Sequence, residues 1–175
     1  MEGRRGLLIV YTGPGKGKTT AALGLLLRAW GRGWPMCVVQ FIKHEGGQWG
    51  EVRAGQKLGI EWHQCGDGFT WRSRDLERTA RLARDGWELA RQKIGSGRYR
   101  LVLLDEFTYP LHFGWLDVGE VVAWLVQARP AHTHVVITGR DAPEALLSAA
   151  DLVTRMELVR HPYQRGEKAV AGIDF

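Results

Sequence analysis

Two patterns of apolar residues alternate along this chain: short apolar runs, and longer stretches in which apolar residues recur every three or four positions. Short runs bounded by Gly, Pro or charged residues are typical of strands buried in a parallel sheet. We predict strands over residues 7–11, 36–42, 60–64, 101–104, 135–138 and 152–158, and a last edge strand over 169–173.

The second pattern predicts helices between these strands, and residues 73–94 give the clearest one. Its apolar residues form a single stripe: Leu76, Ala80, Ala83, Trp87, Ala90 and Ile94. Ser73 is a candidate cap of this helix and Gly95 its candidate end. Further helices are predicted over 19–31, 49–58, 118–127 and 142–150. Strands that alternate with helices predict a three-layer α/β fold with a mostly parallel, doubly wound sheet.

The first predicted strand runs into a loop rich in glycine and lysine, and a helix follows. Residues 12–20 read Thr-Gly-Pro-Gly-Lys-Gly-Lys-Thr-Thr. Glycines let backbone N–H groups crowd around phosphate oxygens, and the helix offers its N-terminus to the anion. We therefore predict a phosphate-binding P-loop, in which Lys18 neutralises phosphate charge and the Thr19 hydroxyl binds Mg²⁺. The strict motif has glycine where Thr12 stands, and a plain glycine turn before a helix is the alternative interpretation.

A second element supports the P-loop, because the apolar run over 101–104 ends in Asp105 and Glu106. Carboxylates at the carboxyl end of a parallel strand would lie beside the P-loop and reach Mg²⁺ directly or through water. Together the two elements predict a P-loop NTPase fold of RecA-like type. The residues predicted to bind the nucleotide through the loop are Gly13, Pro14, Gly15, Lys16, Gly17, Lys18, Thr19 and Thr20.

Composition narrows the class of protein only a little. A chain of 175 residues with 45% hydrophobic content predicts one globular domain over 1–175. We find no apolar run long enough for a membrane span and no signal-peptide pattern, so we expect a cytoplasmic protein without a membrane partner. Cys37 and Cys65 lack the spacing of a metal site, and so few cysteines fit a reducing compartment. The net charge of +5 suits a polyanionic ligand and would also suit nucleic acid.

Three loops leave the carboxyl ends of predicted strands and should meet the P-loop, because ligands bind there in parallel α/β sheets. One of them begins with Gln40, over residues 40–43, and a second begins with Thr138 and ends in Arg140, in the run Thr-Gly-Arg. Another carries Phe69 and Trp71 in a glycine-flanked segment. Two large aromatic side chains in such a loop either plug the core or form a wall for a large planar ligand, and both interpretations stay open from the residues alone.

With these motifs, the chain resembles the ATP:corrinoid adenosyltransferases of the bacterial P-loop class. The matching segments keep the order of that family and extend from about Gly6 to the end of the chain; they are residues 12–20, 38–43, 68–71, 104–109, 137–140, 161–163 and 172–175. A Thr in place of the first P-loop glycine is typical of the family. The resemblance is specific, since other P-loop enzymes lack both the Phe-Thr-Trp loop and the Thr-Gly-Arg loop.

The resemblance implies that cobalt(I) of a reduced corrinoid attacks C5′ of ATP and expels triphosphate, in adenosylcobalamin biosynthesis or salvage. Lys16, Lys18 and Mg²⁺ would stabilise the leaving group. Thr19 and Glu106 would bind Mg²⁺ with Asp105 nearby, and Arg140 would add charge at the nucleotide. Phe69 and Trp71 would occupy the lower axial face of the corrinoid, exclude the axial base and ease reduction of cobalt. The expected catalytic residues are thus Lys18, Phe69 and Trp71.

We expect an electron donor such as a reduced flavoprotein, a homodimer and no nucleic-acid partner.

Two other functions stay open. One is a P-loop ATPase or small-molecule kinase, with Glu106 positioning water or substrate. The other is a RecA-type ATPase that binds nucleic acid, favoured only by the basic charge. The sequence does not say whether the corrinoid is cobalamin, cobinamide or an earlier intermediate. The products discriminate between the functions, because only adenosyl transfer yields triphosphate and a cobalt–carbon bond.

Overall fold

A computed structural model describes residues 5–42, 49–66 and 76–174 of the chain. Its centre is one six-stranded sheet in the order β3-β2-β4-β5-β1-β6. Every pair of neighbouring strands is parallel. The strands are β1 (Leu8–Thr12), β2 (Met36–Phe41), β3 (Glu61–Cys65), β4 (Leu101–Asp105), β5 (His134–Thr138) and β6 (Leu152–Arg155). The parallel order places the carboxyl ends of β1, β2, β4 and β5 along one rim of the sheet.

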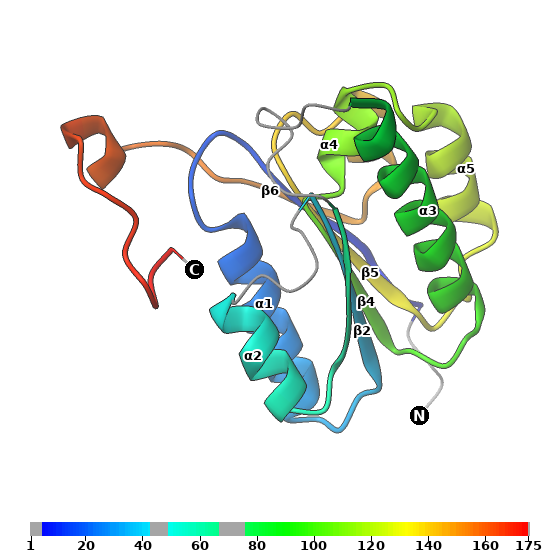
Figure 1. Ribbon diagram of the computed structural model, residues 1–175. Helices are drawn as coiled ribbons and strands as arrows, with labels where there is room; N and C mark the ends of the chain where they lie inside the picture. The colour runs from blue at the N-terminus through cyan, green and yellow to red at the C-terminus, as the bar shows by residue number, and fades with distance from the viewer. Residues whose placement is uncertain (1–4, 43–48, 67–75, 175) are drawn as a thin grey trace.

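Helices cover both faces of this sheet, as Figure 1 shows. Helices α1 (Lys18–Trp30) and α2 (Gly50–Lys57) lie on one face. The other face carries α3 (Leu76–Gly95), α4 (Thr108–His112), α5 (Val118–Gln127) and α6 (Glu144–Ala149), which share a core with it. The predicted three-layer, doubly wound α/β fold is confirmed. No helix of the described residues is long and apolar enough to cross a membrane.

An apolar core lies on each face of the sheet, and alternate residues of each central strand pack into one core or the other. In β4, Val102 and Leu104 enter the core under α3 and α5. Their neighbours Leu101 and Leu103 enter the core under α1. Such strands are buried on both faces, which is why they read as continuous apolar runs instead of alternating ones.

Two predicted strands near the end of the chain differ from the structure, and two short helices were not predicted. The strand predicted over 152–158 ends at Arg155, and the edge strand predicted over 169–173 is wrong. Residues 170–174 instead form a turn, in which the N–H of Val170 donates to Asp174 Oδ2 at 2.8 Å and the N–H of Asp174 donates to the carbonyl of Val170 at 2.8 Å. A side chain that binds its own backbone nearby competes with strand pairing. The short helix α4 and the 3-10 helix η2 (Pro162–Arg165) escaped prediction, since neither is long enough to show a period.

Candidate functional site

The loop between β1 and α1 has the conformation that a P-loop requires. Gly13 and Gly17 have φ angles of 98° and 115°, in the left-handed region, and Gly17 caps α1. The loop also packs closely on the chain that leaves β6. A Cβ on Gly13 would lie 2.5 Å from the carbonyl oxygen of Met156, and one on Gly15 would lie 2.5 Å from that of Glu157. These glycines therefore serve close packing as well as the turn.

Thr12 takes the place of the first motif glycine without strain, because it is still part of β1 and has no positive φ. Its side chain is buried, and its hydroxyl accepts a hydrogen bond from the N–H of Ala142 at 3.3 Å. The threonine thus ties the start of the P-loop to the segment that follows β5. A β-branched residue suits this strand position better than glycine would.

Lys18 folds back onto the P-loop. Its Nζ donates to the carbonyls of Gly13 at 2.9 Å and Gly15 at 2.6 Å, and only 7% of the residue is exposed. Burial lowers the pKa of Lys18; the nearby Glu106 carboxylate opposes this shift and the Arg140 guanidinium adds to it. A cation held inside a glycine loop at a helix N-terminus gives the site a concentrated positive charge.

Asp105 connects the carboxyl ends of three strands to the start of α1. Its Oδ1 accepts hydrogen bonds from the hydroxyls of Thr19 at 2.8 Å and Thr138 at 2.7 Å. Its Oδ2 accepts one from the Gln40 amide at 2.9 Å, and the residue is 1% exposed. Sequence reasoning placed Gln40 and Thr138 at the starts of loops that should meet the P-loop, but it gave neither of them a role in the site. The sequence signal for such a role is a polar residue near the carboxyl end of an apolar run. A polar side chain there is buried with the strand and therefore needs a hydrogen-bond partner.

Glu106 follows Asp105 in a strained conformation, with a φ of 59° that a non-glycine residue rarely adopts. Its N–H donates to the Thr138 hydroxyl at 2.9 Å, which fixes this turn against β5. Strain of this kind is typical of functional sites. The Glu106 carboxylate favours a higher pKa for both Lys18 and Tyr109, so it lies near both side chains.

The oxygen donors of this site fit Mg²⁺. Thr19 gives its hydroxyl hydrogen to Asp105, so its lone pairs remain available to a cation. Asp105 itself already accepts three hydrogen bonds, which suits it to orient Thr19. The Glu106 carboxylate would supply a second hard oxygen ligand, in keeping with the one or two protein groups plus phosphate oxygens that typically bind Mg²⁺. Among the described residues, the group of His, Cys, Asp and Glu ligand atoms close enough to share one ion lies elsewhere, at Cys37, Glu61 and His63.

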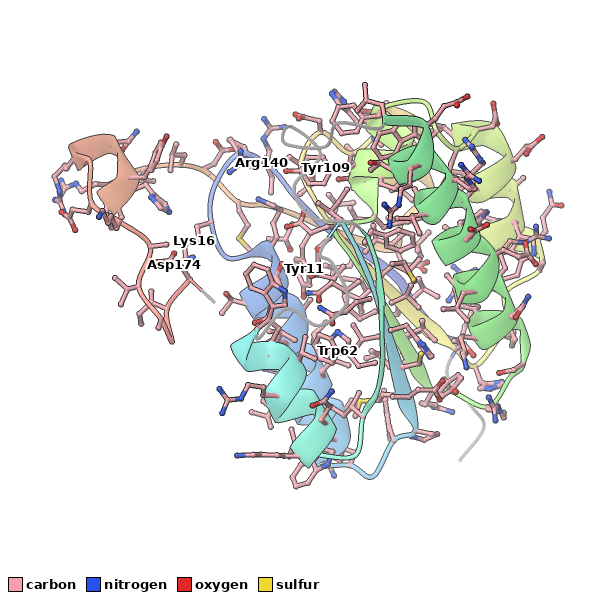
Figure 2. The ribbon with its side chains drawn as sticks, in the orientation of Figure 1. Tyr11, Lys16, Trp62, Tyr109, Arg140 and Asp174 are labelled. Atoms are coloured by element: carbon pink, nitrogen blue, oxygen red, sulfur yellow. The ribbon has the colours of Figure 1, made fainter. Side chains whose placement is uncertain are left out.

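Arg140 and Tyr109 close one side of the site, and Figure 2 shows them near each other above the sheet. The Thr108 hydroxyl donates to the carbonyl of Arg140 at 2.5 Å. A Cβ on Gly139 would overlap that hydroxyl oxygen, and the φ of Gly139 is 145°. Only glycine allows this approach, so α4 and the loop after β5 hold Arg140 in place together. Burial raises the pKa of Tyr109, with a further contribution from Glu106.

The structure brings together most residues that the sequence predicted for the site. A hydrogen bond joins Thr19 to Asp105. Lys18 lies close enough to Glu106 and Arg140 for their charges to act on its pKa. Pro14 and Thr20 are exposed, and Lys16 forms an ion pair with Asp174. Phe69 and Trp71 lie outside the described residues.

Comparisons with known proteins agree with this geometry. A family model described as ATP:corrinoid adenosyltransferase BtuR/CobO/CobP matches residues 4–175. The corrinoid adenosyltransferase of a Sinorhizobium species is 44% identical over 98% of this chain and 81% of its own length. Those of Pseudomonas aeruginosa and Escherichia coli K12 are 41% and 40% identical, over 98% and 99% of this chain and 84% and 88% of their own.

A solved structure adds support for the fold alone. The flagellar accessory protein FlaH of Methanocaldococcus jannaschii superimposes with a TM-score of 0.61 over 90% of this chain and 74% of its own, at 11% sequence identity. So low an identity says nothing about activity, because one fold serves many functions.

Proposed function

Because the chain belongs to the BtuR/CobO/CobP family of ATP:corrinoid adenosyltransferases, we propose that the P-loop and the Asp105 cluster form its ATP site. The protein is an enzyme that transfers the adenosyl group of ATP to a corrinoid in cobalamin synthesis. The observation that carries the assignment is the family-model match over residues 4–175, supported by the 44% identity to the Sinorhizobium enzyme and by the P-loop.

The proposed reaction is a displacement at carbon. The electron pair of cobalt(I) forms the bond to C5′ of ATP, and the pair of the C5′–O bond leaves with triphosphate. The leaving group carries about four negative charges, so stabilisation of that charge is the main task of the protein. Lys16, Lys18 and the N–H groups of the P-loop supply it at the loop, and Arg140 adds positive charge near Lys18. No side chain has to act as nucleophile or general base.

We further propose that Thr19 and Glu106 hold Mg²⁺ and that Asp105 orients Thr19. When bound, the ion neutralises part of the triphosphate charge. Gln40 and Thr138 fix the Asp105 carboxylate from two other strands, so the hydroxyl of Thr19 is preorganised before ATP arrives. Preorganisation of this kind avoids reorganisation cost during the reaction.

Phe69 and Trp71 are proposed to cover the lower axial face of the corrinoid, as the family resemblance implies. If they exclude the axial base, replacing both with Ala should impair the enzyme mainly when cobalt(II) cobalamin must be reduced on it. The defect should shrink with chemically generated cobalt(I), and with cobinamide, which has no lower base. An equal loss on all three substrates, with a lowered melting temperature, would assign the pair to the core instead.

Three features of the cellular setting are proposals as well: a cytoplasmic location, an electron donor such as a reduced flavoprotein, and a homodimer. Exposed apolar residues on the edge strand β6 and beyond it, including Leu152, Val153 and Leu158, support the homodimer. Sedimentation at micromolar concentration should give twice the chain mass of 19.7 kDa.

The function is tested by incubating the protein with chemically reduced corrinoid and Mg-ATP. We expect the visible spectrum of a cobalt–carbon bond to appear with an equal amount of triphosphate. Formation of ADP without a spectral change would point to a kinase or ATPase, and stimulation of that activity by DNA would point to a RecA-type protein. Omission of Mg²⁺ tests the proposed ion in the same assay.

A further inference from the structure

The segment after β6, residues 156–174, contacts the P-loop at both of its ends. We call it the tail segment. At its start, the N–H of Gly15 donates to the carbonyl of Met156 at 2.8 Å, and the N–H of Met156 donates to the carbonyl of Thr12 at 2.8 Å. At its far end, the Lys16 ammonium forms an ion pair with the Asp174 carboxylate. Figure 2 shows Lys16 and Asp174 together beside the start of α1.

Between these two contacts the tail segment projects away from the body of the molecule, as Figure 1 shows. Most of its residues are exposed, Val159 and Tyr163 to 92% and 79%. Among the described residues, the hydrogen bonds of positions 160–173 join partners within the segment, such as Gln164 with His161. The ion pair with Lys16 is therefore the side-chain contact that holds the far end of the segment against the P-loop.

A short turn holds the carboxylate of Asp174 in position for this ion pair. Its Oδ2 accepts a hydrogen bond from the N–H of Val170 at 2.8 Å, and its own N–H donates to the carbonyl of Val170. Gly172, with a φ of 82°, allows the turn between them. The turn leaves Oδ1 for Lys16. The Asp174 carboxylate, already oriented by the turn, thus binds the ammonium of Lys16 in the P-loop.

We infer that Asp174 competes with the triphosphate for Lys16, so that ATP binding displaces the end of the tail segment and Asp174 returns when triphosphate leaves. This inference rests on the proposed function, because it takes Lys16 as a ligand of the phosphates. A carboxylate and a triphosphate carry charge of the same sign and cannot share one exposed ammonium without repulsion. Coupling of this kind is reciprocal: release of the tail favours nucleotide, and nucleotide favours release of the tail.

The test compares Asp174→Asn with the wild type in binding Mg-ATP and inorganic tripolyphosphate, measured by titration calorimetry. The amide keeps an oxygen for the N–H of Val170 but loses the charge. We expect both ligands to bind about two- to fivefold more tightly, the range for loss of one exposed ion pair. Glu167→Gln is the matched control, because Glu167 pairs with Arg165 within the same segment, and its affinities should stay at the wild-type values. Unchanged or weaker binding by Asp174→Asn would overturn the inference.

Lys16→Ala separates this inference from the proposed function. It should weaken tripolyphosphate binding, and the double variant Lys16→Ala/Asp174→Asn should bind no more tightly than Lys16→Ala alone. If Lys16→Ala binds normally, the proposed phosphate contact of Lys16 fails. If it binds weakly while Asp174→Asn matches the wild type, only the competition fails.

Hydrogen exchange gives a readout that does not depend on affinity. The amides of Val170 and Asp174 are protected by hydrogen bonds of the turn that presents the carboxylate. Saturating Mg-ATP should speed their exchange in the wild type, because the displaced turn loses its anchor on Lys16. Slower or unchanged exchange would show that the tail stays closed over the bound nucleotide and would contradict the inference.

Discussion

At the scale of single residues, Lys18 combines burial with charge in a way that only the fold makes possible. Its ammonium is held by two carbonyls of the P-loop, although burial disfavours the charged form. The compensation comes from the loop dipoles and from the Glu106 carboxylate. In the proposed reaction, a cation arranged in advance like this would stabilise the charge of the leaving triphosphate.

Removal of this cation gives the first prediction. Lys18→Ala should lower kcat/KM for adenosyl transfer by about 10²- to 10³-fold, the loss typical of one preorganised charge-stabilising donor. Lys57→Ala, an exposed lysine on α2, serves as the control and should keep full activity. A kcat/KM of Lys18→Ala within a few-fold of the wild-type value would reject the P-loop assignment.

A second cluster of charged residues lies at the opposite rim, where β2 and β3 begin, and it stabilises the fold. Glu61 Oε1 accepts hydrogen bonds from Lys93 at 2.5 Å and His63 at 2.7 Å, and Oε2 accepts one from the Tyr99 hydroxyl. These bonds, that of Lys93 above all, lower the pKa of Glu61 from its ordinary value of 4.5 to about 2. The contribution of the charged form to stability is thus complete above pH 4.5 and is lost as the pH falls toward 2.

We therefore expect Glu61→Gln to lower the free energy of unfolding at pH 7 by about 1 kcal/mol, since the cluster is partly exposed. The difference from wild type should shrink as the pH falls from about 5 toward 2. Urea unfolding at several pH values measures both effects. Glu88→Gln, which removes a surface ion pair with Arg91, is the control and should show neither. A difference that stays constant with pH would mean that the charge of Glu61 is not what stabilises the cluster.

At the scale of elements, the packing of α3 on the sheet depends on a glycine in the middle of the helix. A Cβ on Gly86 would lie 2.8 Å from the Cβ of Cys65 and 3.0 Å from Cε1 of Phe41. Gly24 in α1 has nothing within 4 Å of the same position. Both are helical glycines, so they differ mainly in the space around them.

Alanine at these two positions should change stability in opposite directions. Gly86→Ala should destabilise the protein by about 1–3 kcal/mol, because the helix has to move away from β2 and β3. Gly24→Ala should stabilise it by about 0.5–1 kcal/mol through helix propensity alone. Equilibrium unfolding in urea measures both. A stabilised Gly86→Ala variant would show that the helix and sheet can separate without cost.

At the scale of the whole molecule, the proposed nucleotide site joins distant parts of the fold. Asp105 links β4 with β2, β5 and α1 through three hydrogen bonds, and the P-loop links β1 with the chain after β6. A ligand bound at this rim therefore restrains most of the sheet. Its binding should raise global stability by mass action, because the unfolded chain has no such site.

This linkage predicts the behaviour of Glu106→Gln. In the wild type, Mg-ATP at about 100 times its Kd should add about 2.7 kcal/mol to the free energy of unfolding, and ATP with a chelator clearly less. In Glu106→Gln we expect the ATP effect to persist while its dependence on Mg²⁺ is largely lost. Melting curves with and without the ion decide this. A variant that melts early without ligand but keeps the Mg²⁺ dependence would make Glu106 a structural residue.

The order of the elements and the identity of the phosphate-binding loop could be predicted from the residues alone. Both depend on neighbours in the chain: apolar runs such as 101–104, the helical stripe that includes Ala83 and Trp87, and the glycines before Lys18. Periodicity and turn chemistry are local, so they can be recognised without the fold. Where a local signal was weak, as over 169–173, the prediction failed.

Which polar residues meet at the site depends instead on how the chain packs. Thr19 and Gln40 reach Asp105 across 86 and 65 residues of sequence, and Lys16 reaches Asp174 across 158. The acid-ended strand predicts that Asp105 lies near the P-loop, but no local pattern specifies the individual hydrogen bonds. The contacts of Asp105 follow from the order in which the parallel strands lie side by side, and the contact of Lys16 follows from the path of the chain after β6. The same order sets the roles of Asp105, which orients Thr19, and of Gly139, which lets α4 approach Arg140. Chemistry in this protein is thus assembled from strand ends that only the packing of the sheet makes neighbours.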